Sequence, residues 1–244
     1  LHPRVRRQRQ MCIRDRDKLR GMFGFAVWNE KEQTLMLARD FFGIKPVYYA
    51  EIDGHFVFAS EIKSILVFPG YERKVNQKAL EQYLSFQYSP LEETFFKGIY
   101  KLMPGHMLLY KNGSYEIKTY FKPKLTPGQW DHKTNMAQLR SQLSEILKDS
   151  VKHHMLSDVE VGAFLSGGVD SGYLASSSGA DQAFTVGFDE GDRYSEVNKA
   201  AKVAEKVGLK HHVKIISKQE FWDALPDVMY LSLIHISEPT RPLY

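Results

Sequence analysis

The sequence is poor in the features that mark secreted and membrane proteins. Its 244 residues include a single cysteine, Cys12, which excludes an internal disulfide and favours a reducing, cytosolic compartment. No apolar run approaches the roughly 20 residues that a membrane-spanning helix needs. The basic N-terminus is not followed by the apolar stretch of a signal peptide. With 43% hydrophobic and 25% charged residues, the composition is typical of a globular protein rather than a membrane protein.

Positive charge is concentrated at one end of the chain. The formal net charge is +4, but residues 1–16 alone carry six arginines and one acid, Asp15. A nucleic-acid-binding protein needs lysine and arginine spread over a folded face, so nucleic acid is not favoured as a partner. Residues 1–16 have no helical or strand period, and 231–244 form an apolar and then proline-containing string unrelated to the helix pattern before it, so we expect both to be non-native or disordered tails. The rest is interpreted as an internal piece of a longer protein.

Residues 17–121 have the alternation of apolar and polar residues that predicts mixed strands, with turns at Asp53-Gly54 and Asn112-Gly113. Two short helices interrupt them, with Ser60 and Asn76 as candidate N-caps. The expected strands are 21–29, 34–39, 46–50, 55–59, 98–102, 106–110 and 114–120, and the expected helices are 60–67 and 77–87.

After a linker predicted at 122–135, the pattern changes to alternating strands and helices. A helix at 136–153 has an apolar face, and Ser217 is a candidate cap for the last helix. Such alternation predicts a doubly wound parallel sheet over 136–230, and an α/β fold class for the chain. The expected strands are 159–165, 183–188 and 211–216, and the helices are 171–178, 195–208 and 218–230.

The segment Ser-Gly-Gly-Val-Asp-Ser, residues 166–171, connects a predicted strand to a predicted helix. Glycines let the backbone approach an anion, peptide N–H groups and the helix start attract it, and hydroxyls can donate to phosphate oxygens. Asp170 would repel phosphate unless it holds Mg²⁺. The segment has neither the P-loop nor the Rossmann spacing. A plain glycine-rich turn is the alternative to a phosphate site.

At these residues the sequence resembles the pyrophosphate loop of the N-type ATP pyrophosphatases, and the wider context resembles glutamine-hydrolysing asparagine synthetases. Seven blocks carry the second resemblance, in the order of that family and over nearly all of 17–230. They are GMFGFAVWN (21–29), LARDFFGIKPVYY (37–49), FASEIKSIL (58–66), KLMPGH (101–106), SDVEVGAFLSGGVDS (157–171), FTVGFDE (184–190) and YSEV (194–197).

The resemblance implies an N-terminal-nucleophile (Ntn) α+β glutaminase sandwich followed by an ATP-pyrophosphatase α/β domain. It implies that glutamine supplies ammonia, and that aspartate is activated by ATP and Mg²⁺ as β-aspartyl-AMP and then amidated. A relative acting on another carboxylate, or an inactive nucleotide-binding fragment, is the alternative. The implied partners are these small molecules, without nucleic acid or membrane, and a homodimer of the full-length protein is compatible with the family.

The resemblance also assigns residues. It implies that Asp170 holds Mg²⁺ and pyrophosphate, and that main-chain groups of Phe164 and Val186 contact adenine. Gly172 replaces a serine common in the family and could weaken the helix start. The full ATP-binding set that the match implies is Phe164, Leu165, Ser166, Gly167, Gly168, Asp170, Ser171 and Val186.

Parts of the family pattern are missing. Its glutaminase nucleophile is an N-terminal cysteine followed by Gly-Ile, whereas Ile13 follows Cys12 here. We therefore expect no glutaminase nucleophile in this chain. The later SGEGSDE-like segment, with its second metal-binding acid, is also absent from the sequence.

Several other residue pairs admit more than one interpretation. Arg39-Asp40 is either near an ammonia tunnel or, as we favour, a surface ion pair that orders a turn. Glu61 and Lys63 are interpreted as a solvated helix start. Tyr194-Ser-Glu196 either contributes to a nucleotide pocket or caps a helix. The histidine pairs 153–154 and 211–212 have no ligand-spaced third residue for a metal.

Overall fold

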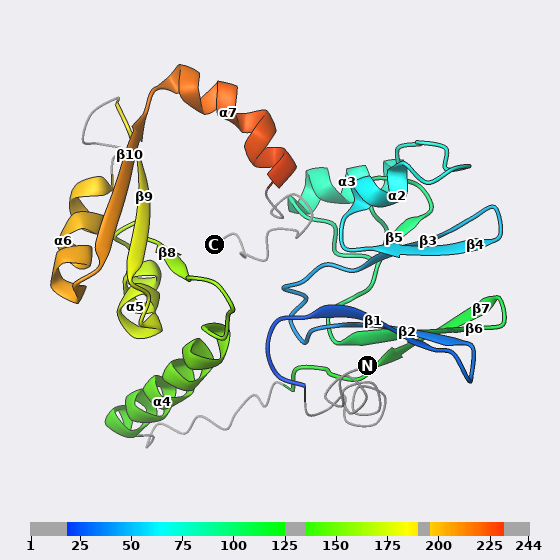
Figure 1. Ribbon diagram of the computed structural model, residues 1–244, viewed down its shortest axis with the longest axis horizontal. Helices are drawn as coiled ribbons and strands as arrows, with labels where there is room; N and C mark the ends of the chain where they lie inside the picture. Colours follow the sequence, from blue (N-terminus) through cyan, green and yellow to red (C-terminus); the bar gives the residue numbers. More distant parts are fainter. Residues whose placement is uncertain (1–18, 125–134, 190–195, 232–244) are drawn as a thin grey trace. The chain divides into compact units, whose positions relative to one another are not determined.

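The computed structural model describes residues 19–124, 135–189 and 196–231, and it divides into two compact units on either side of residue 125 (Figure 1). Most of the linker predicted at 122–135 therefore lies outside the described residues, as do both tails except Leu231, which is the last residue of a helix. Among the described helices, none combines the length and the apolarity that crossing a membrane would require.

The first unit contains two antiparallel sheets. One has the strand order β1-β2-β6-β7 and the other the order β4-β3-β5. The first consists of β1 (Gly24–Asn29), β2 (Thr34–Arg39), β6 (His106–Lys111) and β7 (Ser114–Thr119), and the second of β3 (Tyr48–Ile52), β4 (His55–Ala59) and β5 (Ile99–Lys101).

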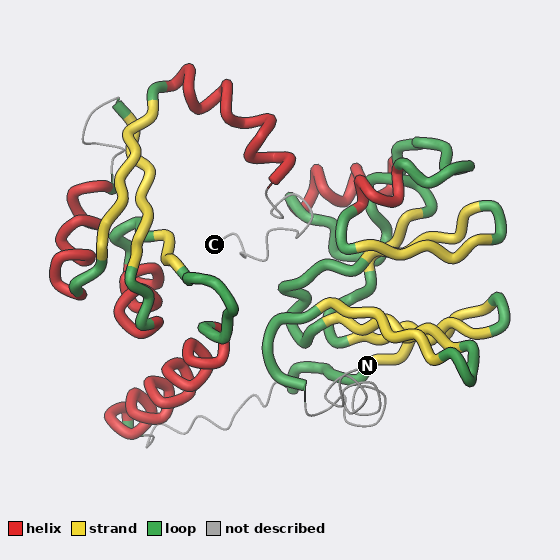
Figure 2. Tube along the Cα trace, viewed as in Figure 1, coloured by secondary structure: helices red, strands yellow, loops and turns green. Residues whose placement is uncertain are grey.

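The two sheets pack face to face. Leu37 and Leu108 from the first sheet and Tyr49 from the second form one buried cluster, each with at most 2% of its surface exposed. The opposite face of the second sheet packs on helix α2 (Ile62–Leu66) through Ile65. This layering, visible in Figure 2, confirms the predicted sandwich.

Local signals predicted this unit well, with two kinds of error. All seven strands form, but β1 and β3 begin later than expected. Asn76 caps helix α3 (Gln77–Phe86) by accepting a hydrogen bond from the N–H of Ala79. Ser60 is wrong as a cap, because α2 begins at Ile62 and its cap position is Glu61, which forms an ion pair with Lys63 (2.5 Å). The pair lies at the helix start as interpreted, but Glu61 Oε2 is buried rather than solvated.

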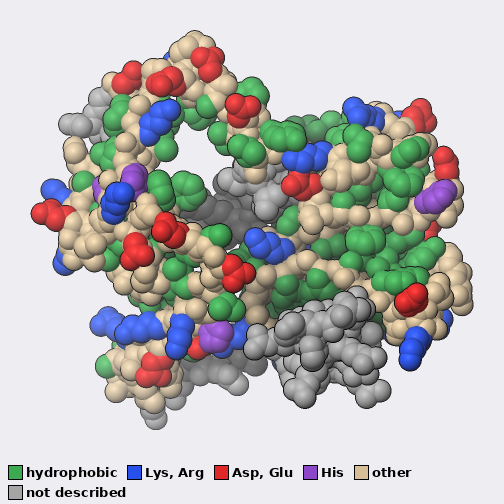
Figure 3. All heavy atoms as spheres, in the orientation of Figure 1, with side chains coloured by type: hydrophobic (Ala, Val, Ile, Leu, Met, Phe, Trp, Pro, Cys, Tyr) green, Lys and Arg blue, Asp and Glu red, His purple; other side chains and the backbone are tan. Residues whose placement is uncertain are grey.

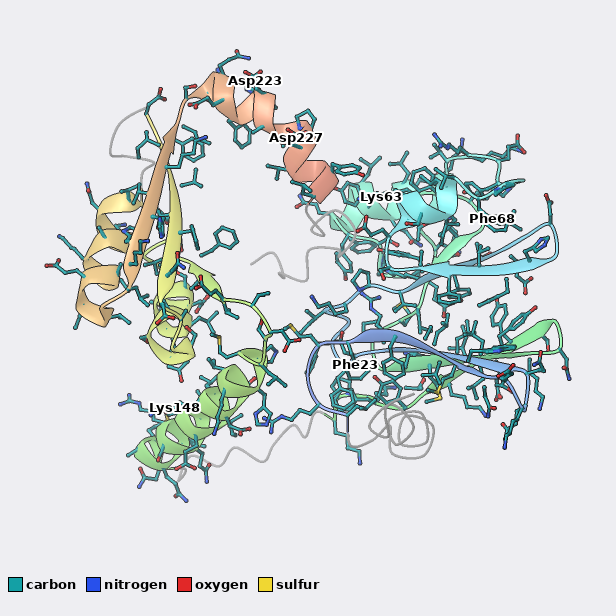
Figure 4. The ribbon with its side chains drawn as sticks, viewed as in Figure 1. Phe23, Lys63, Phe68, Lys148, Asp223 and Asp227 are labelled. Atoms are coloured by element: carbon teal, nitrogen blue, oxygen red, sulfur yellow. The ribbon has the colours of Figure 1, made fainter. Side chains whose placement is uncertain are left out.

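Arg39 and Asp40 form a buried hub at the end of β2, so the predicted surface location is wrong: they are 7% and 1% exposed. The Arg39 guanidinium donates to the carbonyls of Gly43, Lys45 and Leu102 at 2.6–3.0 Å. The Asp40 carboxylate accepts from the N–H groups of Phe23, Phe42, Ile44 and Lys45 at 2.9–3.3 Å (Phe23 is labelled in Figure 4). The hub does order the turn at 40–45, as expected.

The Asp40→Asn variant is expected to destabilise this unit by about 2–3 kcal/mol, because an amide replaces the charged acceptor and turns an N–H₂ group toward backbone N–H groups. Chemical denaturation of the 244-residue chain, with hydrogen exchange of 19–124 as the local readout, measures this. Glu116→Gln is the matched control, since Glu116 forms an exposed ion pair with Lys118 (2.9 Å) that contributes little. Equal stability of the two variants would contradict the role given to Asp40.

The second unit contains a parallel sheet of order β10-β9-β8. Helices α5 and α6 pack on one face through a core of small side chains, among them Ala175, Ala183 and Ala200, around Leu165. This confirms the predicted α/β class. The elements are α4 (Met136–His154), β8 (Gly162–Phe164), α5 (Val169–Ser178), β9 (Gln182–Phe188), α6 (Val197–Val207), β10 (Lys210–Ile216) and α7 (Lys218–Leu231).

Boundaries here differ from expectation at the central connection. β8 covers three residues rather than 159–165, because its pairing with β9 ends at Phe164, and α5 begins at Val169, two residues before the predicted start. The cap of α7 is as predicted: Ser217 Oγ accepts from the N–H of Glu220, whose carboxylate accepts from the N–H of Ser217.

Apolar side chains come to the surface in both units (Figure 3). On the sheet face away from the α5–α6 core, Phe164 is 85% and Val186 51% exposed. Helix α4 forms as predicted, but its apolar face is largely uncovered. Leu143 and Ile146 are 56% and 65% exposed, and only Val151 on that face is buried. The described elements thus leave large apolar surfaces uncovered.

Candidate phosphate-binding site

The loop at 166–171 lies where the sequence places it. It follows the carboxyl end of β8, and its last three residues form the first turn of α5. Because β8, β9 and β10 are parallel, their carboxyl ends share one edge, which is where open α/β sheets bind ligands.

The two loop glycines have different roles. Gly167 has a φ of +73°, and a Cβ there would lie 2.6 Å from the Cβ of Lys199 and 2.9 Å from the backbone N of Ala200. The N-terminus of α6 therefore packs directly on this backbone, and only glycine fits. Gly168 has an ordinary φ of −77° and is the N-cap of α5, and a Cβ there would meet nothing closer than Ser166 Oγ at 3.4 Å.

The N–H groups of the first turn point out of the start of α5. The first bond within the helix runs from the N–H of Gly172 to the carbonyl of Gly168 (3.0 Å), so the N–H groups of Val169, Asp170 and Ser171 precede it. Among the described residues, no side chain caps this end at Gly168. Together with the helix dipole, these groups can bind an anion.

Two hydroxyl groups border the same space. Ser166 Oγ and Ser171 Oγ are 3.0 Å apart, and Ser171 Oγ also accepts a hydrogen bond from the N–H of Ser166 at 3.3 Å. The structure therefore brings Ser166, Gly167, Gly168 and Ser171 together in one cradle.

Asp170 is exposed, in the first turn of α5. Its carboxylate is available to a cation that a phosphate group would bring with it. Within the described residues, no group of three or more His, Cys, Asp or Glu side chains could hold a metal ion by itself. The donor set thus fits Mg²⁺ shared between one carboxylate and phosphate oxygens.

The other predicted contact residues are Phe164 and Val186 on the strands and Leu165, which directly follows β8. Leu165 is 2% exposed, and its N–H donates to the carbonyl of Phe184 (2.9 Å). Phe164 is paired with Phe184, and Val186 lies two residues farther along β9, so the side chains of Phe164 and Val186 share the exposed face.

No sequence motif singles out Thr185, which is 5% exposed and hydrogen-bonded both to Leu165 and to His211. His212 contacts Gln182 (3.0 Å) and stacks on Phe184 instead. His153 and His154 bond to carbonyls one turn earlier in α4. Each of these histidines is explained by its hydrogen bonds. The register between β9 and β10, which brings Thr185 next to His211, cannot be deduced from the residue pattern of either strand alone.

Tyr194-Ser195 lies outside the described residues. Glu196 occupies the N-cap of α6, but its side chain makes no capping bond there. The capping interpretation of this segment therefore does not extend to Glu196.

The two units define a class of protein: a two-sheet amidotransferase sandwich followed by an α/β domain with a glycine-rich loop at its strand edge. Comparisons with known families agree, because residues 9–121 match a glutamine amidotransferase domain and residues 142–242 match asparagine synthase. Over these two segments the chain is similar to a part of the glutamine-hydrolysing asparagine synthetases.

Individual relatives extend well beyond this chain. It is 38% identical to asparagine synthetase [glutamine-hydrolyzing] 1 of Bacillus subtilis over 93% of its own length and 36% of that protein. It is 35% identical to a putative asparagine synthetase of Mycobacterium tuberculosis, with the same two coverages. It is 29% identical to the amidase chyE of Penicillium rubens, over 90% of this chain and 35% of that protein. The chain thus spans little more than a third of these relatives.

Proposed function

We propose that the complete protein containing this chain amidates aspartate to asparagine in the cytosol, using ATP and ammonia from glutamine. The first unit belongs to the part that releases ammonia. The second unit belongs to the part that activates the aspartate side chain as β-aspartyl-AMP, so that AMP rather than oxide leaves when ammonia attacks. The products are asparagine, AMP and pyrophosphate.

One observation carries this proposal: the cradle at 166–171. Its free-pointing N–H groups at the start of α5, its two paired hydroxyls and the close approach at Gly167 suit the β- and γ-phosphates of ATP. Those groups hold negative charge on the departing pyrophosphate and stabilise it as the bond to the α-phosphate breaks. Asp170 is the residue we assign to Mg²⁺, which supplies charge neutralisation on the phosphates when bound.

The main-chain groups of Phe164 and Val186 are proposed to contact adenine, with Leu165 joining that contact to the loop. Phe164 and Val186 are both exposed on strands next to the loop. Leu165 can take part only through its backbone, because its side chain lies in the core.

The test uses the complete protein with MgATP, aspartate and glutamine. We expect pyrophosphate release to require aspartate, and asparagine to form with glutamine or with ammonium. Pyrophosphate release that ignores aspartate but responds to another carboxylate would reject this substrate. The 244-residue chain alone is proposed to release no ammonia from glutamine, since Cys12 does not match the family's nucleophile. Turnover by that chain would contradict this.

A second acceptor is favoured by one observation, the similarity to a protein named as a fungal amidase. Under this alternative the loop would still activate a carboxylate with ATP, and only the acceptor would differ. A panel of amino-acid and peptide carboxylates in the same assay separates the two.

A further inference from the structure

A buried hydrogen-bond bridge connects β10 to the start of the phosphate loop. The hydroxyl of Thr185 on β9 lies 2.6 Å from the carbonyl oxygen of Leu165 and 2.7 Å from Nε2 of His211 on β10. A carbonyl can only accept, so the single hydroxyl proton goes to Leu165. His211 must then donate its Nε2–H to the threonine oxygen, which fixes the direction of the bridge.

The bridge acts on one particular peptide group. The carbonyl of Leu165 and the N–H of Ser166 belong to the same planar unit. Its carbonyl side is held by Thr185, and its N–H side donates to Ser171 Oγ (3.3 Å), the hydroxyl that pairs with Ser166 Oγ (3.0 Å). Rotation of this peptide would break both attachments, and the Ser171 hydroxyl would keep only its bonds to the Gly168 carbonyl (3.3 Å) and to Ser166 Oγ (3.0 Å).

The surrounding packing leaves this peptide few other restraints. The side chain of Leu165 is fixed in the core, and its N–H is bonded to Phe184. The next residues, Ser166 and Gly168, are exposed, and Gly167 has the left-handed conformation that glycine enters at little cost. A loop with such freedom needs an external restraint at its first peptide if its N–H groups are to converge on an anion. If the peptide turned its carbonyl toward the same space, that oxygen would repel the anion.

We propose that Thr185 and His211 are positioning residues for the loop: through the Leu165–Ser166 peptide, they hold the seryl hydroxyls and N–H groups in the arrangement that binds phosphate. Neither residue touches the nucleotide. The inference rests on the proposed function, since it assumes that the loop binds the phosphates of ATP. It adds two residues on neighbouring strands that the motif itself does not contain.

The test compares variants of the complete protein. Thr185→Val keeps the shape and loses the hydroxyl, Thr185→Ser keeps the hydroxyl, and His211→Ala removes the donor. His212→Ala is the matched control, because His212 is adjacent on β10 but bonds to Gln182. We expect Thr185→Val and His211→Ala to lower kcat/KM for MgATP about 10- to 100-fold. For Thr185→Ser and His212→Ala, kcat/KM for MgATP should stay within about threefold of the wild-type value, because both variants keep the hydrogen bond to the Leu165 carbonyl.

Two further readouts distinguish positioning from general stability. Hydrogen exchange of β8, β9 and β10, measured on the same preparations, reports whether the second unit is folded, and ammonia release from glutamine reports the same for the first. Calorimetric titration with MgATP reports loop binding without turnover. Wild-type MgATP affinity in His211→Ala overturns the proposal, even if Thr185→Val fails to fold. If the wild-type protein neither binds MgATP nor releases pyrophosphate with any carboxylate, the proposed function fails and the bridge keeps only a structural role.

Discussion

The Asp170→Asn variant of the complete protein is expected to release pyrophosphate about 100- to 1,000-fold more slowly than wild type at saturating aspartate. Asparagine keeps the size of the side chain but loses the charge that makes the carboxylate a ligand for Mg²⁺. The exposed position of Asp170 in the first turn of α5 makes the change local. The rate is measured by coupled detection of pyrophosphate over a range of Mg²⁺ concentrations.

The same substitution at Asp181 provides the control. Asp181 is also exposed, but it precedes β9 and therefore lies at the opposite, amino edge of the sheet. Asp181→Asn should leave both the rate and the Mg²⁺ requirement unchanged. If Asp170→Asn retained the wild-type rate and Mg²⁺ dependence, the role assigned to its carboxylate would have to be abandoned.

The Gly167→Ala variant is expected to be destabilised by about 2–5 kcal/mol in the second unit. Alanine in the left-handed region costs about 1–2 kcal/mol. Overlap of its Cβ with Lys199 and Ala200 forces the loop away from α6, which costs about 1–3 kcal/mol more. The closest of these atoms would be 2.6 Å away, and one of them belongs to the backbone, so a side-chain rotation cannot relieve the overlap.

Hydrogen exchange of β8, α5 and α6 in the 244-residue chain measures this local loss of stability. Gly168→Ala is the matched comparison, because its φ is −77° and the nearest atom, Ser166 Oγ, would be 3.4 Å from the new methyl group. That variant should change stability by less than about 1 kcal/mol. Similar exchange in the two variants would show that the contact with α6 does not restrain the loop.

Features encoded by adjacent residues were predictable from the sequence. The Asn112-Gly113 turn, the cap at Asn76 and the glycine-rich loop each depend on a few consecutive residues, and all three lie where expected. Boundaries were less predictable. Residues 159–161 continue the apolar pattern of β8, but the strand exists only where β9 offers pairing partners, from Gly162 to Phe164.

Features that depend on distant residues were missed. Arg39 and Asp40 are charged neighbours in the sequence, which favoured a surface pair. They are buried because carbonyl and N–H groups of three other segments, at Phe23, at 42–45 and at Leu102, satisfy them. Thr185 and His211 meet only through the register of two parallel strands. The spacing of residues along the sequence does not reveal this register, so neither residue was predicted to be part of the site.

The Arg39–Asp40 hub also sets an order of events during synthesis. The Arg39 guanidinium needs the carbonyl of Leu102, 63 residues later, and its own carbonyl accepts from the phenol of Tyr120, 81 residues later. Burial and the charge of Asp40 raise the pKa of Tyr120 to about 12, so this phenol remains a donor at any physiological pH. The bonds within residues 23–45 can form early, but the bonds to Leu102 and from Tyr120 cannot form until those residues have left the ribosome. The sandwich closes as a late, long-range event rather than strand by strand.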